Sequence, residues 1–187
     1  VAHNRAFGHS AIGEGVEMRI WCGAFLLAAL TFVGFGARVH ASGEPQSLTK
    51  ARATDIENGV RAFMRVVAHD VTQDGPAAWR KHFADRPAFF MAVDGHLVFP
   101  NSAAATAGIQ GAAGMFKHIE LRWGDDLRVD PLAENLAVVA ASYREVRVDT
   151  AGKQVDEHGF FTGTVERRDG CWQFRNVHWS AAAPVAK

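Results

Sequence analysis

The side chains best suited to chemistry lie near the C-terminal end, where residues 171–180 alternate in the manner of a β-strand. Alternation places one set of residues on one face: Trp172, Phe174, Asn176, His178 and Ser180. If the aromatic members of this set face the interior, Asn176 and His178 face it too. A neutral His beside an Asn could hydrogen-bond a ligand carbonyl, or His178 could transfer a proton near neutral pH. The alternative is a structural His178 bonded to a backbone carbonyl.

Three further side chains are candidates for contact with a ligand. Tyr143, the only Tyr of the chain, could polarise a carbonyl in a pocket or pack in the core with its hydroxyl bonded. Trp123 could form a pocket wall or part of the core. His118, expected at the end of a helix, could donate to the last helical carbonyls or line the mouth of a pocket.

Composition excludes several classes of protein. Twenty basic and twenty acidic residues give a formal charge of zero, which argues against nucleic-acid binding. Zinc-protease, phosphate-loop and Ser-hydrolase motifs are missing from the sequence, and the His residues after position 41 are scattered. We therefore expect neither a metal nor a cofactor. Cys171 is expected to be a half-buried strand residue, since no base is recognisable beside it.

The N-terminal residues have the pattern of an export signal. Residues 18–41 combine Arg19, an uncharged apolar run and a small-residue site at Ala41, after which we expect cleavage. The alternative is a retained membrane anchor. The run covers only about 16 residues, fewer than the roughly 20 of a membrane-spanning helix, which favours the cleaved signal. Residues 1–17 contain no Met, which suggests an upstream leader before a start at Met18. We expect an exported protein, periplasmic or extracellular, without a stable anchor after cleavage.

The first half of the remaining chain predicts helices and a hairpin. Residues 42–53 are polar and predict a flexible lead-in; the capping-box pattern from Thr54 to Glu57 then predicts a helix start. Apolar residues follow at helical spacing: Ile56, Val60, Phe63, Val67 and Val71. Further helices are expected at 77–83 and 102–119. Between them, strands at 89–93 and 96–99 are joined by a tight turn at Asp94 and Gly95.

The second half reads as strands. Residues 121–129, 136–148, 154–167 and 171–180 are long strand-like runs with short connections, which predicts an antiparallel meander. Helices, then a hairpin, then strands indicate one α+β domain with helices on one side of a sheet. We assign residues 54–180 to this domain and 181–187 to a tail. Long strands in a small sheet must twist and curl, which favours a concavity for a small ligand.

Four segments carry a resemblance to a known family: Phe116 to Trp123, Leu136 to Tyr143, Gly159 to Trp172 and Asn176 to Ser180. Their order and spacing resemble the nuclear transport factor 2-like superfamily, and within it the SnoaL-like branch, across residues 54–180. The closing hairpin with its Arg-Asp-Gly-x-Trp turn is the most specific part. The resemblance implies a cone-shaped, strongly curved antiparallel sheet wrapped around three N-terminal helices, with a pocket open at one end.

The resemblance also implies a function. Catalytic relatives such as ketosteroid isomerases, polyketide cyclases and dehydratases use a carboxylate or His base inside the cone. We expect a small, largely apolar ligand in the pocket and acid–base chemistry of isomerase, cyclase or dehydratase type. His178 is the candidate base, with His118 or Asp70 as weaker candidates. The alternative is a non-catalytic dimerisation or protein-interaction module that uses the outer sheet face, and a homodimer is expected under both readings.

Overall fold

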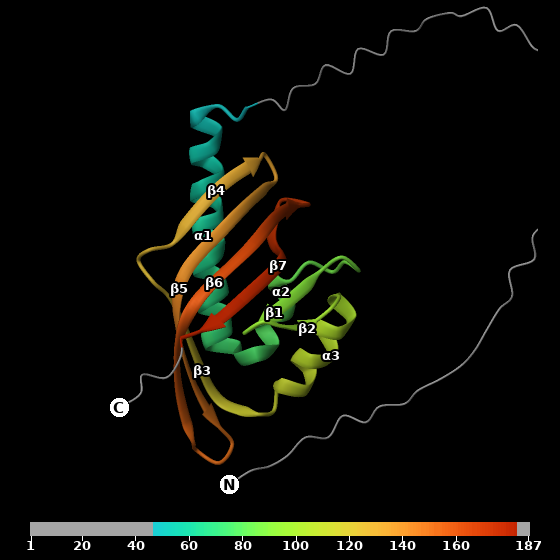
Figure 1. The fold of residues 1–187 in the computed structure, drawn as a ribbon, viewed down its shortest axis with the longest axis vertical. Coiled ribbons are helices and arrows are strands. Elements are labelled where there is room, and N and C mark those ends of the chain that lie inside the picture. The colour runs from blue at the N-terminus through green and yellow to red at the C-terminus, as the bar shows by residue number, and fades with distance from the viewer. Residues whose placement is uncertain (1–46, 183–187) are drawn as a thin grey trace, which may run out of the picture. The chain divides into compact units, whose positions relative to one another are not determined.

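The computed structural model describes residues 47–182. The predicted leader, the signal peptide and the first part of the lead-in lie outside the described residues, as does most of the predicted tail. The described chain runs from a long helix through two short helical segments and a hairpin into a third helix and five strands (Figure 1). None of the described helices is long and apolar enough to cross a membrane.

Helix α1 (Lys50–Asp74) starts five residues earlier than the predicted capping box at Thr54 required. Its N-cap is Thr49, whose hydroxyl accepts a hydrogen bond from the backbone N–H of Arg52 at 3.2 Å. Thr54 lies one turn inside the helix and donates to the Lys50 carbonyl, so the predicted capping box is wrong. The predicted apolar face is confirmed, since all five of its residues are buried, together with Met64. Gly75 ends the helix at a positive φ of 74°.

The other two predicted helices are shorter than expected. Residues 77–82 belong to a 3-10 turn, η1 (Gly75–Ala78), and to one α-helical turn, α2 (Trp79–His82), and Phe83 is already extended. Helix α3 (Ser102–Ala112) ends before the predicted boundary at residue 119, because the chain from Phe116 pairs with a strand instead. Among the described residues, only α1 and α3 are longer than a single turn, whereas three helices had been expected inside the curved sheet.

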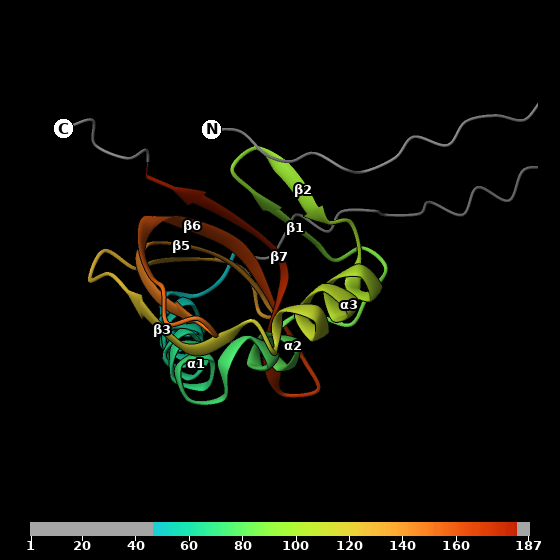
Figure 2. The ribbon, with the colours of Figure 1, turned by 90° about the horizontal axis from the view of Figure 1, so that it is seen from below.

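Seven strands form one curved sheet that does not close on itself (Figure 2). They are β1 (Phe90–Val93), β2 (His96–Phe99), β3 (Phe116–Trp123), β4 (Arg128–Ala133), β5 (Leu136–Asp149), β6 (Gln154–Arg168) and β7 (Cys171–Ala181). Their order is β2-β1-β7-β6-β5-β3, and β4 also pairs with β5. The predicted single strand at 121–129 is thus two strands, both of which pair with β5. The predicted hairpin is confirmed, with positive φ at Asp94 and Gly95.

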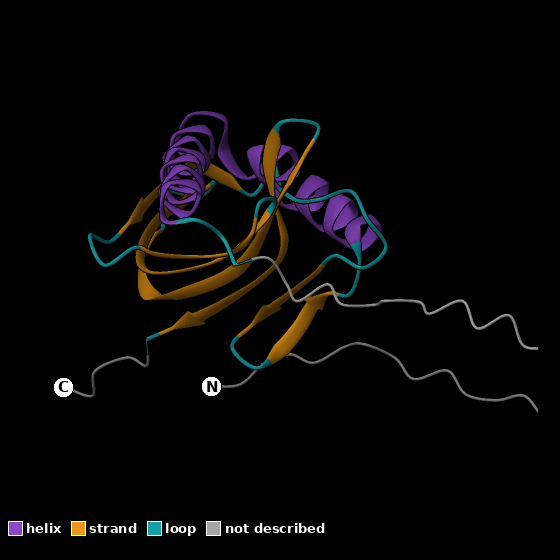
Figure 3. Cartoon of the chain, turned by 90° about the horizontal axis from the view of Figure 1, so that it is seen from above, coloured by secondary structure: helices purple, strands orange, loops and turns teal. Residues whose placement is uncertain are grey.

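The sheet is mixed, so the expectation of an antiparallel sheet is wrong. Strands β5, β6 and β7 form the predicted antiparallel meander, but β1 joins β7 in parallel. A parallel pair cannot be joined by a short turn, and α3, β3, β4, β5 and β6 all lie between β1 and β7 in the chain. Local turn signals therefore could not reveal this pairing. Helix α1 lies across the concave side of the sheet, and α2 and α3 lie toward the β1–β2 hairpin (Figure 3).

Candidate functional site

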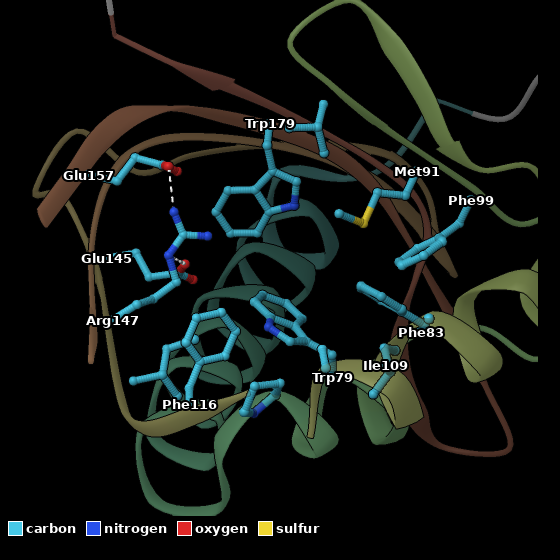
Figure 4. Close-up of a pocket in the computed structure, with 15 residues that line it drawn as sticks. Trp79, Phe83, Met91, Phe99, Ile109, Phe116, Glu145, Arg147, Glu157 and Trp179 are labelled. Carbon is cyan, nitrogen blue, oxygen red and sulfur yellow. Dashed lines mark hydrogen bonds and ion pairs between the residues drawn. The ribbon is translucent and has the colours of Figure 1, made fainter. Parts of the chain in front are cut away.

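A cavity of about 230 Å³ lies between the inner face of the sheet and the segments η1, α2 and α3. Five aromatic side chains form much of its wall: Trp79, Phe83, Phe99, Phe116 and Trp179. Smaller apolar residues complete it: Pro76, Met91, Val93, Gly108, Ile109, Ala112 and Ile119. The three charged lining residues, Glu145, Arg147 and Glu157, lie together at one end (Figure 4). The cavity is thus an apolar chamber with one polar end.

Strand alternation places this polar end. Tyr143, Glu145 and Arg147 occupy every second position of β5 and share the inner face with buried Ala137, Val139 and Ala141. Glu157 of β6 is the register partner of Glu145. Two carboxylates therefore face each other across neighbouring strands, an arrangement that is unfavourable unless a positive charge compensates it.

Arg147 supplies that charge. Its Nη2 donates to Oε2 of Glu157 at 2.7 Å, and its Nε lies 3.3 Å from Oε1 of Glu145. The Tyr143 hydroxyl donates to the other Glu157 oxygen, Oε1, at 2.8 Å. Gly159 is the register partner of Tyr143, and its missing side chain leaves space that the Tyr143 ring fills. Glu157 is thus held by two donors, whereas Glu145 has only an ion pair without hydrogen-bond geometry.

Burial controls the protonation of this cluster. Glu145 is 9% exposed, and its burial raises the pKa of the carboxyl from 4.5 to about 7; Arg147 opposes this shift and Glu157 adds to it. Burial, together with the hydrogen bond to Glu157, also raises the pKa of Tyr143, which therefore stays a donor. The raised pKa lets Glu145 change charge near neutral pH, the property that a general acid or base requires.

The predicted base does not lie in this cavity. His178 is exposed on the outer face of β7, because a bulge reverses the alternation. Phe174 pairs with Val165 and Asn176 pairs with Thr164, so Arg175 is an extra residue without a partner. Beyond it, Val177 and Trp179 point inward. The prediction that Asn176 and His178 face the interior is therefore wrong.

The remaining predicted residues have mixed positions. Tyr143 is buried beside the cavity and reaches it through Glu157. Trp123 is partly buried and packs against the core, where its Nε1 donates to the Met64 carbonyl at 2.8 Å and its ring stacks on Trp179. His118 is exposed on β3, since the helix on which it was expected ends at Ala112.

Asp70, the weaker candidate base, pairs with a residue that lies outside the cavity lining. Its Oδ2 lies 3.0 Å from Nε2 of the buried His82. Burial lowers the pKa of His82, although Asp70 acts in the opposite direction. The ring of His82 packs edge-on against Phe63. This partly buried pair therefore joins α1 to α2.

The sequence contains a signal for Glu145 and Arg147, which were not among the predicted site residues. Alternation along β5 puts Glu145 and Arg147 on the same face as Tyr143, so following the pattern two and four residues further would have found them. The partnership with Glu157 needs the β5–β6 register. Among residues 47–182, no group of three His, Cys, Asp or Glu side chains could hold a metal ion.

Comparison with known proteins gives matches by structure alone. No family model matches the sequence, and no curated protein matches it. A scytalone dehydratase-like protein from Novosphingobium aromaticivorans superimposes with a TM-score of 0.60 at 14% identity, over 70% of this chain and 85% of that chain. A nuclear transport factor 2-like superfamily protein from Salmonella enterica serovar Typhimurium gives 0.58 at 14% identity, over 74% and 96%. The chain has a nuclear transport factor 2-like fold.

A hexachlorocyclohexane dehydrochlorinase has the same nuclear transport factor 2-like fold and superimposes with a TM-score of 0.59 at 12% identity, over 74% of this chain and 94% of that chain. At such identities the likeness concerns the fold. Structures with this fold thus include proteins named as enzymes and proteins named only by superfamily. The chemistry of this chain has to be inferred from its own pocket.

Proposed function

We propose that this protein binds a small, largely apolar molecule in the pocket and acts on it by acid–base chemistry, with Glu145 as the base. The observation that carries the proposal is a glutamate that is nine-tenths buried, lines an aromatic cavity and has a pKa raised to about 7. A base of this pKa is available in both protonation states at neutral pH. Dehydratase-like and dehydrochlorinase structures of the same fold support a catalytic role.

Arg147 complements the base. Its Nη2 donates to Glu157. Its Nη1 donates to no acceptor among residues 47–182 and is free to donate to a ligand oxygen. Ionised Glu145 takes a proton from a carbon next to a carbonyl, and the electron pair of the C–H bond moves onto the carbonyl oxygen. Arg147 stabilises that negative charge. In an isomerisation, the electron pair re-forms the carbonyl and protonated Glu145 gives its proton to a different carbon of the conjugated enolate. In an elimination, the carbonyl re-forms, a C=C bond forms, the bond from the neighbouring carbon to the leaving group breaks, and protonated Glu145 gives its proton to that group.

Deuterium exchange tests this step without knowledge of the natural substrate. The probe is 1-indanone in D₂O, and the measurement is deuterium incorporation next to its carbonyl, followed by NMR. We expect the protein to accelerate incorporation and Glu145→Gln to lower the rate by about 100-fold. His178→Ala, a change on the outer face, serves as the control and keeps the rate. No acceleration, or full activity of Glu145→Gln, would contradict the proposal.

A second candidate function concerns the outer face of the sheet. Phe90 and Phe160 are 43% and 45% exposed on this face. The residues around them are small or uncharged in the main: Ala92, Thr162, Thr164, Asn176, His178 and Ser180. Such a face suits a second copy of the chain, and we propose a homodimer. Sedimentation of the protein and of Phe160→Glu tests it: the variant should be a monomer, and a monomeric parent protein would refute the dimer.

Export is a further part of the proposal, which rests on the sequence pattern of residues 18–41. Expression of the full chain followed by N-terminal sequencing of the extracytoplasmic protein should give Ser42 as the first residue. A protein recovered with residues 18–41 attached would contradict cleavage. We propose that the domain acts in that compartment without a nucleic-acid partner, because the charge of the chain is balanced.

A further inference from the structure

The polar end of the pocket carries more negative than positive charge. Glu145 and Glu157 stand against one guanidinium, that of Arg147, and the other lining residues are uncharged. Tyr143, packed behind Glu157, adds a hydroxyl donor and no charge. Strands β1, β2, β3 and β7 and the segments η1, α2 and α3 contribute only apolar groups to the lining. The pocket therefore has a net charge of −1 when both carboxyls are ionised and zero when Glu145 is protonated.

This count disfavours charged ligands of either sign. For an anion, the positive charge of Arg147 is already compensated by Glu157 on Nη2 at 2.7 Å and by Glu145 near Nε at 3.3 Å. It would leave a net negative charge in an apolar chamber, which is costly. A cation would lie beside the guanidinium and compete with it for the same carboxylates. An uncharged oxygen meets neither obstacle, because it brings no charge into the pocket. It can accept a hydrogen bond from the free Nη1 of Arg147.

Glu145 adds a second point of contact. The residue is nine-tenths buried and lines the cavity, and its carboxyl has no hydrogen-bond donor among the described residues. A ligand hydroxyl could donate to it, and a ligand carbonyl could accept from its protonated form. The cavity volume of about 230 Å³ limits the rest of the ligand. A cavity of about 150 Å³ is enough for benzene, so about one or two rings fit here.

We propose that the pocket takes an uncharged molecule of about one or two rings with a hydroxyl or carbonyl oxygen at one end, and that it rejects anions of the same shape. This rests on the proposed function, since it names the substrate class of the same pocket. The ring system lies against the aromatic wall made by Trp79, Phe116 and Trp179, and the oxygen faces Arg147 and Glu145 (Figure 4). Charge, rather than shape alone, sets the selectivity.

Four indanes of equal ring size test the inference: 1-indanone, 1-indanol, 1-aminoindane and indane-1-carboxylate. Isothermal titration at pH 8 should show the ketone and the alcohol binding, and the carboxylate binding at least about tenfold more weakly. Glu145→Gln removes one negative charge, so carboxylate affinity should rise about tenfold while the ketone changes less. Glu120→Gln makes the same charge change on β3 outside the cavity lining and should leave all four affinities unchanged.

Three results would overturn the inference. They are a carboxylate that binds as tightly as the ketone, an amine that binds most tightly, and no binding by any of the four compounds. The last would also count against the proposed function. If the carboxylate binds best while the protein still catalyses deuterium exchange, only the charge selectivity fails. If the ketone binds without exchange, the proposed catalysis fails and the selectivity stands.

Discussion

Glu145 lies directly opposite Glu157 in the register of β5 and β6, and the two carboxylates share one end of an apolar cavity. Arg147 bridges them. The two acids are held differently, because Glu157 receives hydrogen bonds from Arg147 and Tyr143, whereas Glu145 has no such donors. This asymmetry separates a carboxyl that is anchored by two donors from one whose raised pKa lets it exchange its proton near neutral pH.

The pKa of Glu145 predicts how stability depends on pH. Between its ordinary pKa of 4.5 and its folded pKa of about 7, the folded state binds the proton more tightly than the unfolded state does. The free energy of unfolding therefore falls as the pH rises through this window. Glu145→Gln removes this dependence. We measure the free energy of unfolding in urea at pH 5 and pH 8. Relative to the parent protein, the free energy of unfolding of the variant should be higher at pH 8 than at pH 5 by up to about 3 kcal/mol. An equal difference at both pH values would contradict the shift.

Arg147→Met should be destabilising at pH 8, because it leaves Glu145 and Glu157 facing each other without a cation. We expect a loss of about 2 to 3 kcal/mol in the free energy of unfolding. The matched control is Arg144→Gln on the same strand, where the ion pair with Asp156 is exposed. That change should cost less than about 1 kcal/mol. Similar losses for both variants, measured by urea unfolding, would show that Arg147 does not hold the carboxylate pair.

Tyr143→Phe separates the hydroxyl of Tyr143 from its ring. The variant keeps the edge-to-face packing on Trp179, with ring centroids 4.7 Å apart, and loses the hydrogen bond to Glu157. We expect a loss of about 1 to 2 kcal/mol in thermal or urea unfolding. Tyr143→Leu removes the ring as well and should cost more, about 3 kcal/mol or above. If Tyr143→Phe is as stable as the parent protein, the hydroxyl contributes nothing to holding Glu157.

Gly108→Ala should disturb the wall of the cavity. Gly108 lies on α3 against the Phe99 ring of β2, and a Cβ at this position would overlap that ring. Phe99 would have to move, so we expect 1-indanone to bind about tenfold more weakly. Gly111→Ala on the same helix meets nothing within 4 Å and should instead stabilise the protein by up to about 1 kcal/mol. Unchanged affinity in Gly108→Ala would show that Phe99 does not shape the pocket.

Local patterns determined much of the fold. The apolar spacing along α1 predicted its buried face, and Asp94 with Gly95 predicted the turn of the hairpin, since both signals act within a few residues. The strand runs from Leu136 onward predicted the meander of β5, β6 and β7 with small errors at the ends. The helix boundaries failed where pairing with distant residues decided the outcome, as for Phe116 to Ile119, which joined β3.

The sequence by itself thus determined an α+β domain with a nuclear transport factor 2-like order of elements, and it placed Tyr143 on an inner face. Only the tertiary structure decided which titratable group lies in the cavity. An extra residue at Arg175 turned His178 outward, which no local pattern announces. The β5–β6 register brought Glu157 to Glu145, and burial beneath the helices raised the pKa of Glu145. Pairing and desolvation join residues far apart in the chain, so they follow from the folded structure alone.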